Sequence, residues 1–194
     1  AVEELTNVSA KTKAGRHHHA LMDIAELRKL YKSIDTLSGS AHVRNALKLQ
    51  ALTAQRTGEV IGAQWSELDL DAATWTIPRS RMKMKLRDHD HVVHLSAQAL
   101  ALLSQMRAAA GDVKPDAYVF PGRPSSEGEP RPGHITDNAV SQAMRRDLKQ
   151  DGLHVPHGWR ASMKTLATRA TDTDERPLFA AQWVETVLDH QSGD

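Results

Sequence analysis

Cysteine is absent from all 194 residues, and its absence removes several classes of protein at once. Without cysteine there is no disulfide framework, no thiolate nucleophile and no cysteine zinc site. The sequence also lacks an apolar run long enough to span a bilayer, and it shows no signal peptide. We therefore expect a cytoplasmic protein without a membrane partner.

Apolar residues make up 40% of the sequence, enough to bury one core and to predict one domain. Asp23 is an expected N-cap of a helix that runs through Tyr31. Helical spacing of apolar residues also leads toward Arg56, and Thr57 and Gly58 indicate a break after it. Further helices are expected at 97–110, 136–148, 158–170 and 178–189, with a small antiparallel sheet between Leu68 and Ser96.

Basic residues are unevenly distributed in a chain whose formal net charge is only +1. That total would not identify a nucleic-acid-binding protein, which usually has a strongly basic domain. Between 79 and 87, however, basic residues occupy every second position, and an extended strand would place them on one face. The cations of this basic row are Arg79, Arg81, Lys83, Lys85 and Arg87. No acid interrupts it, so we expect it to contact a phosphate backbone; a solvated edge strand is the alternative.

Five residues spread along the chain have the chemistry needed to hold and cleave one phosphodiester. They are Arg56, Lys83, His157, Arg160 and His190. A guanidinium offers a planar fork of charged donors that matches phosphate oxygens, so two of them can neutralise a five-coordinate phosphorane. The lysine and the histidines can transfer protons. His157 and Arg160 lie three residues apart at the start of an expected helix, where they share a face beside its positive end.

A supporting carboxylate accompanies these residues, whereas an attacking group is missing. Glu59 lies three residues after Arg56, so on a helix its carboxylate would be within reach of the arginine. This spacing predicts that Glu59 orients Arg56 at least as strongly as it predicts a direct part in the reaction. None of the residues after His190 is a credible nucleophile. The two tyrosines, Tyr31 and Tyr118, lie in an expected early helix and in an apolar run. We expect neither to attack a phosphodiester.

Taken together, these motifs resemble the C-terminal catalytic domain of tyrosine recombinases of the phage and prophage integrase type. The boxes that carry the resemblance are Ala54 to Val60 with Trp65 to Asp71, Trp75 to Ser96, His157 to Ser162, and Val187 to His190. Their joint order and spacing make the resemblance specific. It departs from the family pattern at His94, where relatives more often carry proline, and at the family's tyrosine, which would follow beyond Asp194.

The resemblance implies a mainly α, α+β fold, the catalytic core of the DNA breaking-rejoining enzymes, and a reaction without cofactor or metal. A tyrosine attacks the scissile phosphate, forms a 3′-phosphotyrosine and releases a 5′-hydroxyl, which later attacks the partner strand's link. Arg56 and Arg160 would stabilise the phosphorane, and Lys83 would protonate the leaving oxygen. His157 would assist proton transfer with the nucleophile, and His190 would hydrogen-bond a non-bridging oxygen.

Domain organisation and partners are also implied by the resemblance. Residues 1–22 are expected to be a linker from a missing N-terminal DNA-binding domain. Residues 23–194 are expected to be an integrase-type catalytic domain without its tyrosine segment, and therefore inactive in cleavage. The implied function is site-specific recombination that integrates a phage, prophage or genomic island at double-stranded DNA attachment sites. The full-length protein would act as a tetramer on DNA, and this chain alone would be a monomer or weak dimer.

Three alternatives remain open at this point. Lys85, one strand repeat away on the same face, competes with Lys83 for the role of general acid. A metal-dependent hydrolase would use His89, His91 and His94, of which the first two would share a strand face, although no H-E-x-x-H motif is present. The third alternative is a DNA-binding module without cleavage activity.

Overall fold

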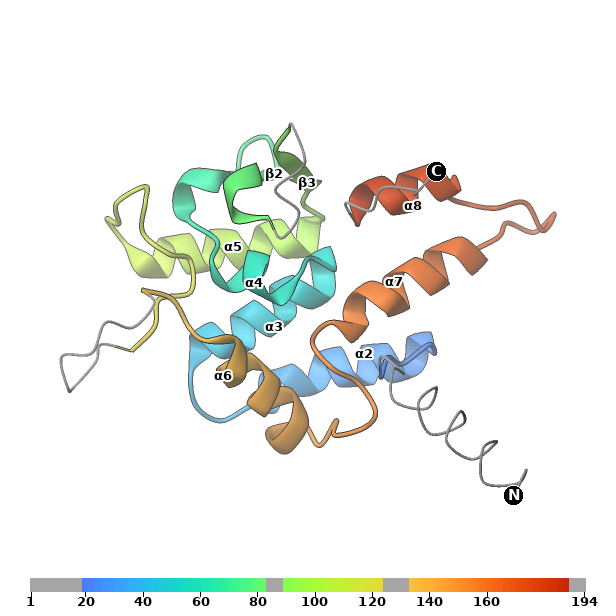
Figure 1. Ribbon diagram of the computed structural model, residues 1–194, viewed down its shortest axis with the longest axis horizontal. Helices are drawn as coiled ribbons and strands as arrows, with labels where there is room; N and C mark the ends of the chain where they lie inside the picture. The colour runs from blue at the N-terminus through green and yellow to red at the C-terminus, as the bar shows by residue number, and fades with distance from the viewer. Residues whose placement is uncertain (1–18, 83–88, 124–132, 189–194) are drawn as a thin grey trace, which may run out of the picture.

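Helix α3, Ala41–Thr53, occupies the centre of the protein, and the other elements are arranged around it (Figure 1). It contacts the short helix α4, Thr57–Ile61, and the helices α5, Ala97–Ala110, and α6, Asp137–Gln142. Leu47 of α3 is completely buried. The computed structural model describes residues 19–82, 89–123 and 133–188.

Side-chain caps begin several helices where the sequence predicts them. Helix α2, Ile24–Ser33, follows Asp23, whose Oδ1 accepts a hydrogen bond from the Glu26 backbone N–H at 2.9 Å. The hydroxyl of Ser96 accepts the backbone N–H of Ala99 and begins α5 in the same way. Such caps satisfy backbone donors that have no partner within the helix, so the signal is local and readable from sequence.

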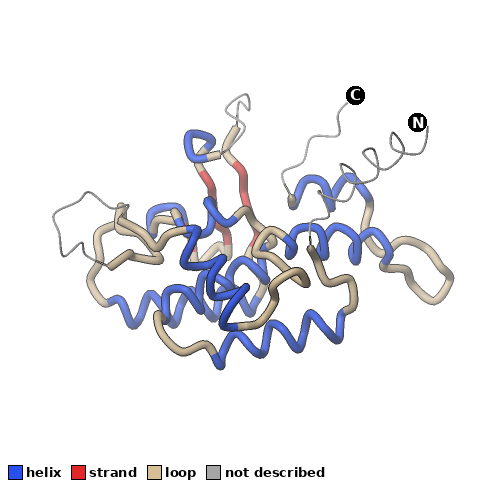
Figure 2. The backbone as a smooth tube through the Cα atoms, turned by 60° about the horizontal axis from the view of Figure 1, so that its bottom comes forward, coloured by secondary structure: helices blue, strands red, loops and turns tan. Residues whose placement is uncertain are grey.

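A three-stranded antiparallel sheet lies beside the helices (Figure 2). Its strands are β1, Leu68–Asp69, β2, Thr74–Ile77, and β3, His91–His94, in that order across the sheet. Trp75 pairs with Val93, and both side chains are buried. Alternate residues of β2 and β3 therefore face the core, and the expected small antiparallel sheet is confirmed.

The prediction of an extended strand through the basic row is wrong for its first two cations, Arg79 and Arg81. After Ile77 the chain leaves β2 and turns through a 3-10 segment at Arg79–Arg81. Backbone hydrogen bonds close this turn, from Arg81 to Pro78 at 2.9 Å and from Met82 to Arg79 at 3.1 Å. A period of two does not apply in a 3-10 turn, so Arg79 and Arg81 do not share a strand face. The other cations of the row, Lys83, Lys85 and Arg87, lie outside the described residues.

Helices α7, Gly158–Arg169, and α8, Ala181–Val187, pack against each other at one side of the protein (Figure 1). An ion pair from Lys164 Nζ to Glu185 Oε1 at 2.6 Å joins them. The last helix begins later than the expected residue 178, because the backbone N–H of Leu178 donates to Ala170 O in the preceding loop. The remaining short segments are the 3-10 turns Ile34–Thr36 and Trp65–Glu67 and the π-helical turn Ala143–Asp147.

The break between α3 and α4 lies earlier than predicted. Thr57 and Gly58, expected to interrupt the helix, instead form the first turn of α4. The interruption falls at Ala54, which ends α3 in a left-handed conformation with φ 53° and ψ 24°. Arg56 is extended and is the N-cap of α4, so its expected position at a helix junction is confirmed.

Two apolar clusters of different size hold the fold together. The large one surrounds the buried side chains of Trp75 and Phe120 and includes residues from α2 to α7. The small one consists of Ala54, Val184 and Leu188, and it packs α8 against the end of α3. Because burial of apolar area is the main source of stability, α8 is held less firmly by packing than the elements around α3.

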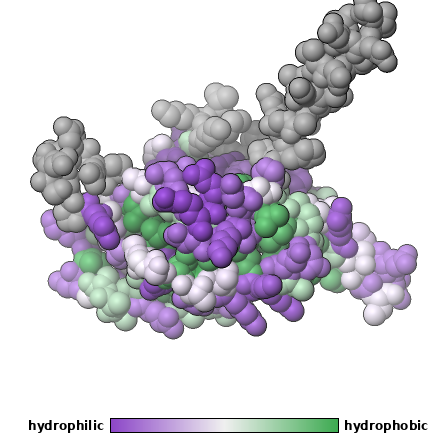
Figure 3. Space-filling view, turned by 90° about the horizontal axis from the view of Figure 1, so that it is seen from below, coloured by the Kyte–Doolittle hydropathy of each residue, from purple (hydrophilic) through white to green (hydrophobic). Residues whose placement is uncertain are grey.

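Figure 3 shows the molecule from below, relative to the view of Figure 1. This face is mainly hydrophilic, with separate smaller apolar areas. Large apolar side chains that are exposed include Leu178, Phe179 and Trp183, on and before α8. Among the residues that the structure describes, no helix is both long and apolar enough to cross a membrane.

Candidate functional site

Arg56 is fixed at the α3–α4 junction by the carboxylate of Glu59. One carboxylate oxygen accepts the Arg56 backbone N–H at 2.9 Å, and the other accepts the guanidinium Nη1 at 2.7 Å. Glu59 is only 3% exposed, whereas the Arg56 side chain is 21% exposed. A buried carboxylate that holds both ends of the arginine restricts its orientation, as the spacing of the two residues predicts.

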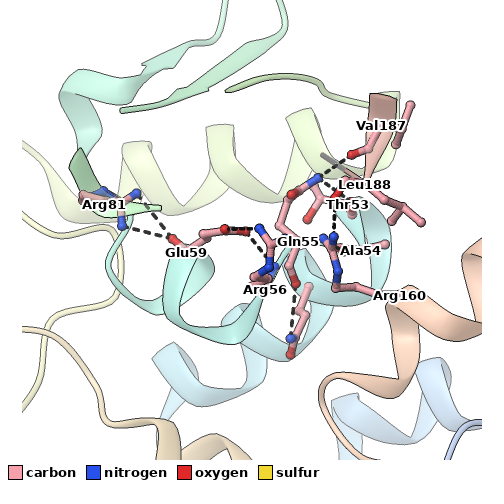
Figure 4. A network of polar contacts seen from close by, with 10 residues as sticks. Thr53, Ala54, Gln55, Arg56, Glu59, Arg81, Arg160, Val187 and Leu188 are labelled. Carbon is pink, nitrogen blue, oxygen red and sulfur yellow. Dashed lines mark hydrogen bonds and ion pairs between the residues drawn. The ribbon is translucent and has the colours of Figure 1, made fainter. Parts of the chain in front are cut away.

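Arg160 approaches the same junction from α7. Its side chain is buried, Nη1 donates to the carbonyl of Ala54 at 2.8 Å, and Nη2 donates to the carbonyl of Leu188 (Figure 4). Burial lowers the pKa of Arg160 to about 10, the positive charge of Arg56 also lowers it, and Glu59 raises it. Arg160 therefore remains protonated at neutral pH.

The two arginines and Glu59 form one electrostatic group, because the charges of Arg56 and Glu59 both act on Arg160. Two guanidiniums and one carboxylate leave a net positive charge at the junction. A phosphodiester carries one negative charge, and a second develops as a nucleophile attacks the phosphorus. Prepositioned cations stabilise that added charge more strongly than the ground state, which is the requirement for catalysis.

Gln55 is a site residue that the sequence analysis missed. It is completely buried between Ala54 and Arg56, and its amide Nε2 donates to Thr53 O at 3.1 Å and to Val187 O at 3.0 Å. It therefore joins the end of α3 to the end of α8 (Figure 4). A glutamine beside Arg56 at a helix break is the only local signal, because its partner Val187 is distant in sequence.

His157 and Arg160 both lie at the first turn of α7, as predicted. His157 is the N-cap residue, and its carbonyl accepts the Arg160 backbone N–H at 3.2 Å. His157 is exposed whereas Arg160 is buried, so the two side chains have different access to solvent. An exposed imidazole at a helix start can exchange protons with a ligand that contacts this surface.

The segment 19–21 is bound to the beginning of α7. The backbone N–H of Val155 donates to His19 O at 3.1 Å, and the Leu21 N–H donates to His154 Nδ1 at 3.0 Å. The hydroxyl of Ser162 donates to Leu21 O. Burial lowers the pKa of His154 to about 4, which keeps the imidazole neutral and able to accept this bond at neutral pH. The entering segment thus helps to fix the helix that carries Arg160.

Other predicted site residues lie away from this junction or outside the described part of the chain. Lys83, Lys85, Arg87 and His190 lie outside the described residues. Arg79 is exposed, and its backbone N–H donates to Asp90 Oδ1 at 2.9 Å. The roles proposed for these residues remain predictions.

The histidine set of the metal-dependent alternative does not form the expected arrangement. His89 precedes β3 and does not share a strand face with His91. Within β3, His91 is buried and His94 is exposed, because alternate residues of a strand face opposite sides. In the described part of the chain, no group of three or more His, Cys, Asp or Glu residues is arranged to hold a metal ion.

A cavity of about 550 Å³ adjoins the α3–α4 junction. Its walls include the end of α3 up to Ala54, strand β3, Met163 of α7, and Thr186 and Val187 of α8. Ala54 of the junction lines this cavity, whereas Arg56, Glu59 and Arg160 do not.

Comparison by sequence identifies similar proteins. The model of the phage integrase family matches residues 21–175. Prophage integrase IntZ of Escherichia coli strain K12 is 31% identical over 173 residues, which is 89% of this chain and 38% of that protein. The integrase of Enterobacteria phage P4 is 30% identical over 199 residues, covering 96% of this chain and 41% of that protein. The chain therefore spans less than half the length of these relatives.

Comparison by structure identifies the same fold. The crystal structure of XerA recombinase superposes with a TM-score of 0.62 at 17% identity, covering 91% of this chain and 56% of that chain. XerH site-specific recombinase, in a pre-cleavage complex with its difH substrate, has a TM-score of 0.61 at 24% identity, covering 90% and 47%. This likeness confirms the predicted mainly α recombinase core with its small sheet.

Proposed function

Because this chain belongs to the phage integrase family, we propose that it is the catalytic domain of a tyrosine-type site-specific recombinase. The full-length protein would integrate a phage, prophage or genomic island into double-stranded DNA. The observation that carries the proposal is the convergence of Arg56 and Arg160 at the α3–α4 junction, where Arg160 Nη1 donates to the Ala54 carbonyl at 2.8 Å, two residues before Arg56.

The reaction is a transesterification at phosphorus. A tyrosine oxygen forms a bond to the scissile phosphate, the bond to the 5′-oxygen breaks, and a 3′-phosphotyrosine results. Arg56 and Arg160 stabilise the charge of the phosphorane, an effect of about 3–4 kcal/mol for one prepositioned donor. Glu59 orients Arg56. Lys83 gives its proton to the leaving 5′-oxygen, and Lys85 is the competing candidate.

The histidines serve proton transfer and phosphate binding. His157, exposed at the start of α7, takes the proton of the attacking tyrosine and later returns it. His190 donates to a non-bridging oxygen. The 3′-phosphotyrosine bond retains the energy of the broken phosphodiester bond, so the reaction needs no cofactor.

We place the attacking tyrosine outside the 194 residues. Tyr118 pairs with Gln64 in an isolated bridge and packs edge to face on His134, with ring centroids 5.0 Å apart. Tyr31 lies in α2. Neither belongs to the segments that hold Arg56 and Arg160, which supports the prediction that this chain alone does not cleave DNA.

Duplex DNA is the proposed substrate, and Arg79, Lys85 and Arg87 are proposed to contact its phosphates. Solved relatives include XerH bound to difH DNA, which supports a DNA partner for this fold. We propose a cytoplasmic protein that assembles as a tetramer on DNA at full length, and a monomer or weak dimer for this chain alone.

A DNA-binding module without cleavage activity is the second candidate, because neither Tyr31 nor Tyr118 lies in the segments that hold Arg56 and Arg160. A chain extended to the family's tyrosine separates the two. Incubated with a nicked suicide substrate, a recombinase accumulates a covalent protein–DNA adduct that survives a denaturing gel. A chain that binds the substrate and forms no adduct is a binding module.

A further inference from the structure

Gln50 is a buried glutamine in the last turn of α3, and its side chain reaches the residues on either side of Arg56. It is only 1% exposed. Its Nε2 donates to Thr57 Oγ1 at 2.9 Å and, more weakly, to the Gln55 carbonyl at 3.4 Å. Gln55 immediately precedes Arg56, and Thr57 immediately follows it. One amide group therefore holds the chain on both sides of the arginine.

The chemistry of the acceptors fixes how the Gln50 amide is turned. A backbone carbonyl can only accept a hydrogen bond, so Nε2 and not Oε1 must face Gln55. The Oε1 atom of Gln50 is buried and has no hydrogen-bond partner among the described residues. Leucine, of similar size, would fill the same space without an unpaired acceptor. Packing alone therefore does not explain a glutamine at this position.

Gln50 connects the two helices to which the two arginines are bound. Arg160 donates to the backbone at the end of α3, whereas Arg56 is held by Glu59 of α4. The bonds of Glu59 orient Arg56 relative to α4, but they do not set the position of α4 relative to α3. The bond from Gln50 to Thr57 crosses this break and joins the last turn of α3 to the first residue of α4.

The other end of α4 is fixed separately by Arg81. The Nε and Nη2 atoms of Arg81 donate to the two carboxylate oxygens of the buried Glu67 at 2.7 and 2.6 Å, which fixes the orientation of the guanidinium. Its Nη1 and Nη2 both lie 3.4 Å from the carbonyl oxygen of Glu59 (Figure 4). Loss of the Gln50 contacts should therefore affect mainly the first turn of α4, which Arg56 begins.

We propose that Gln50 is a positioning residue that sets the place of Arg56 relative to Arg160. Without its amide, the first turn of α4 would shift against the end of α3, and the two guanidiniums would converge less well on one phosphate. Stabilisation of a developing charge depends on donors that are already in place, so a small shift lowers the rate. Gln50 is buried and acts through Arg56, not on the DNA. The inference rests on the proposed function.

Variants at two positions test the contact from both sides. Gln50→Leu removes the amide donor and keeps the volume. Thr57→Val removes the hydroxyl acceptor, whereas Thr57→Ser keeps it. Gln150→Leu is the matched control, because Gln150 also donates its Nε2 to a backbone carbonyl, that of Leu148 at 3.0 Å, in the loop before α7. If Gln50→Leu does not fold, the two Thr57 variants decide alone.

The full-length protein with its tyrosine is assayed in single turnovers on three suicide substrates. The first has an ordinary scissile phosphate. The second has a neutral methylphosphonate, in which a methyl group replaces one non-bridging oxygen, so less negative charge develops there and less is required of the arginines. The third has sulfur at the 5′-bridging position. A thiolate, with a thiol pKa of about 8.5, leaves without a proton, so this substrate needs no general acid.

Misplacement of Arg56 should slow cleavage of the ordinary phosphate by about tenfold to a hundredfold in Gln50→Leu and Thr57→Val. On the methylphosphonate the loss should shrink to about threefold or less, because less charge has to be stabilised. Sulfur should not restore the rate. Arg56→Ala should show the same pattern with a larger loss on the ordinary phosphate. Thr57→Ser and Gln150→Leu should cleave all three substrates close to the parent rate.

Three results would overturn the inference while leaving the proposed function intact. Parent rates for Gln50→Leu and Thr57→Val on the ordinary phosphate would mean that the contact does not position Arg56. Equal loss on the phosphate and the methylphosphonate, with lower thermal stability, would give Gln50 a purely structural role. Recovery with sulfur would connect Gln50 to the general acid instead. A parent protein that cleaves none of the substrates contradicts the proposed function itself, and the inference with it.

Discussion

The backbone carbonyl of Ala54 accepts a hydrogen bond from Nη1 of Arg160 at 2.8 Å, two residues before Arg56. Ala54 has a positive φ of 53°, which costs a non-glycine residue about 1–2 kcal/mol. This conformation ends α3 and allows Arg56 to begin α4. The two arginines of the site are therefore held together through the backbone of the junction, in addition to their shared electrostatic field.

Replacement of Glu59 by glutamine should destabilise the protein. Glutamine can still accept the Arg56 backbone N–H, but the charge-assisted bond to the guanidinium is lost. Hydrogen bonds to charged groups contribute about 1.5–3 kcal/mol, so the free energy of unfolding should fall by about that amount. Urea unfolding at pH 7 measures it. Glu26→Gln, on the exposed side of α2, is the control and should change little. Equal values for the two variants would contradict an orienting ion pair.

Stability should decrease as the pH falls below neutrality because of His154. Its pKa is lowered to about 4 from 6.5, so the unfolded chain takes up a proton before the folded chain does. The contribution is complete above about pH 6.5 and is lost down to about pH 4, by up to about 3 kcal/mol. His154→Gln should flatten this part of the profile in urea unfolding between pH 4 and 7. Parallel profiles for variant and parent would show that His154 is not responsible.

Gln55→Leu should loosen α8 more than the centre of the protein. The variant removes the side-chain donor to Val187 O, at the end of α8. Apart from this bond, α8 is held mainly by the small apolar cluster of Ala54, Val184 and Leu188. An unsatisfied group costs about 1–3 kcal/mol, so the amides of α8 should exchange about tenfold faster or more. Amides of α3 serve as the internal reference in hydrogen exchange. Unchanged protection in α8 would remove Gln55 from the site.

Local signals predicted much of this fold, and contacts distant in sequence decided the rest. Asp23 and Ser96 cap their helices because a side chain and a nearby backbone N–H suffice. The alternation of basic residues predicted an extended strand at Arg79 and Arg81, and this prediction was wrong. Arg81 lies in a turn and pairs with the buried carboxylate of Glu67, which belongs to another segment. The family motifs pointed to Arg56 and Arg160, but the backbone partners of Arg160, the carbonyls of Ala54 and Leu188, depend on the packed structure.

Salt dependence should identify the cations that contact DNA. Each phosphate neutralised contributes about 0.9 to the slope of log affinity against log salt concentration. Joint replacement of Arg79, Lys85 and Arg87 by alanine should reduce the slope by about two to three. Arg81→Ala should leave it unchanged, since its charge is paired with Glu67. Titrations at several salt concentrations that give one slope for the triple variant and the parent would remove these cations from the DNA surface.

Adduct formation by arginine variants tests the central claim most directly. In a chain extended to its tyrosine, Arg56→Ala and Arg160→Ala should fail to form a covalent adduct with ordinary DNA and with 5′-bridging sulfur DNA. Both arginines act on non-bridging oxygens, which sulfur at the bridging position does not change. Lys83→Ala should form the adduct only with sulfur DNA. The 194-residue chain should form none. Normal adduct yield from either arginine variant would contradict the assignment of this site.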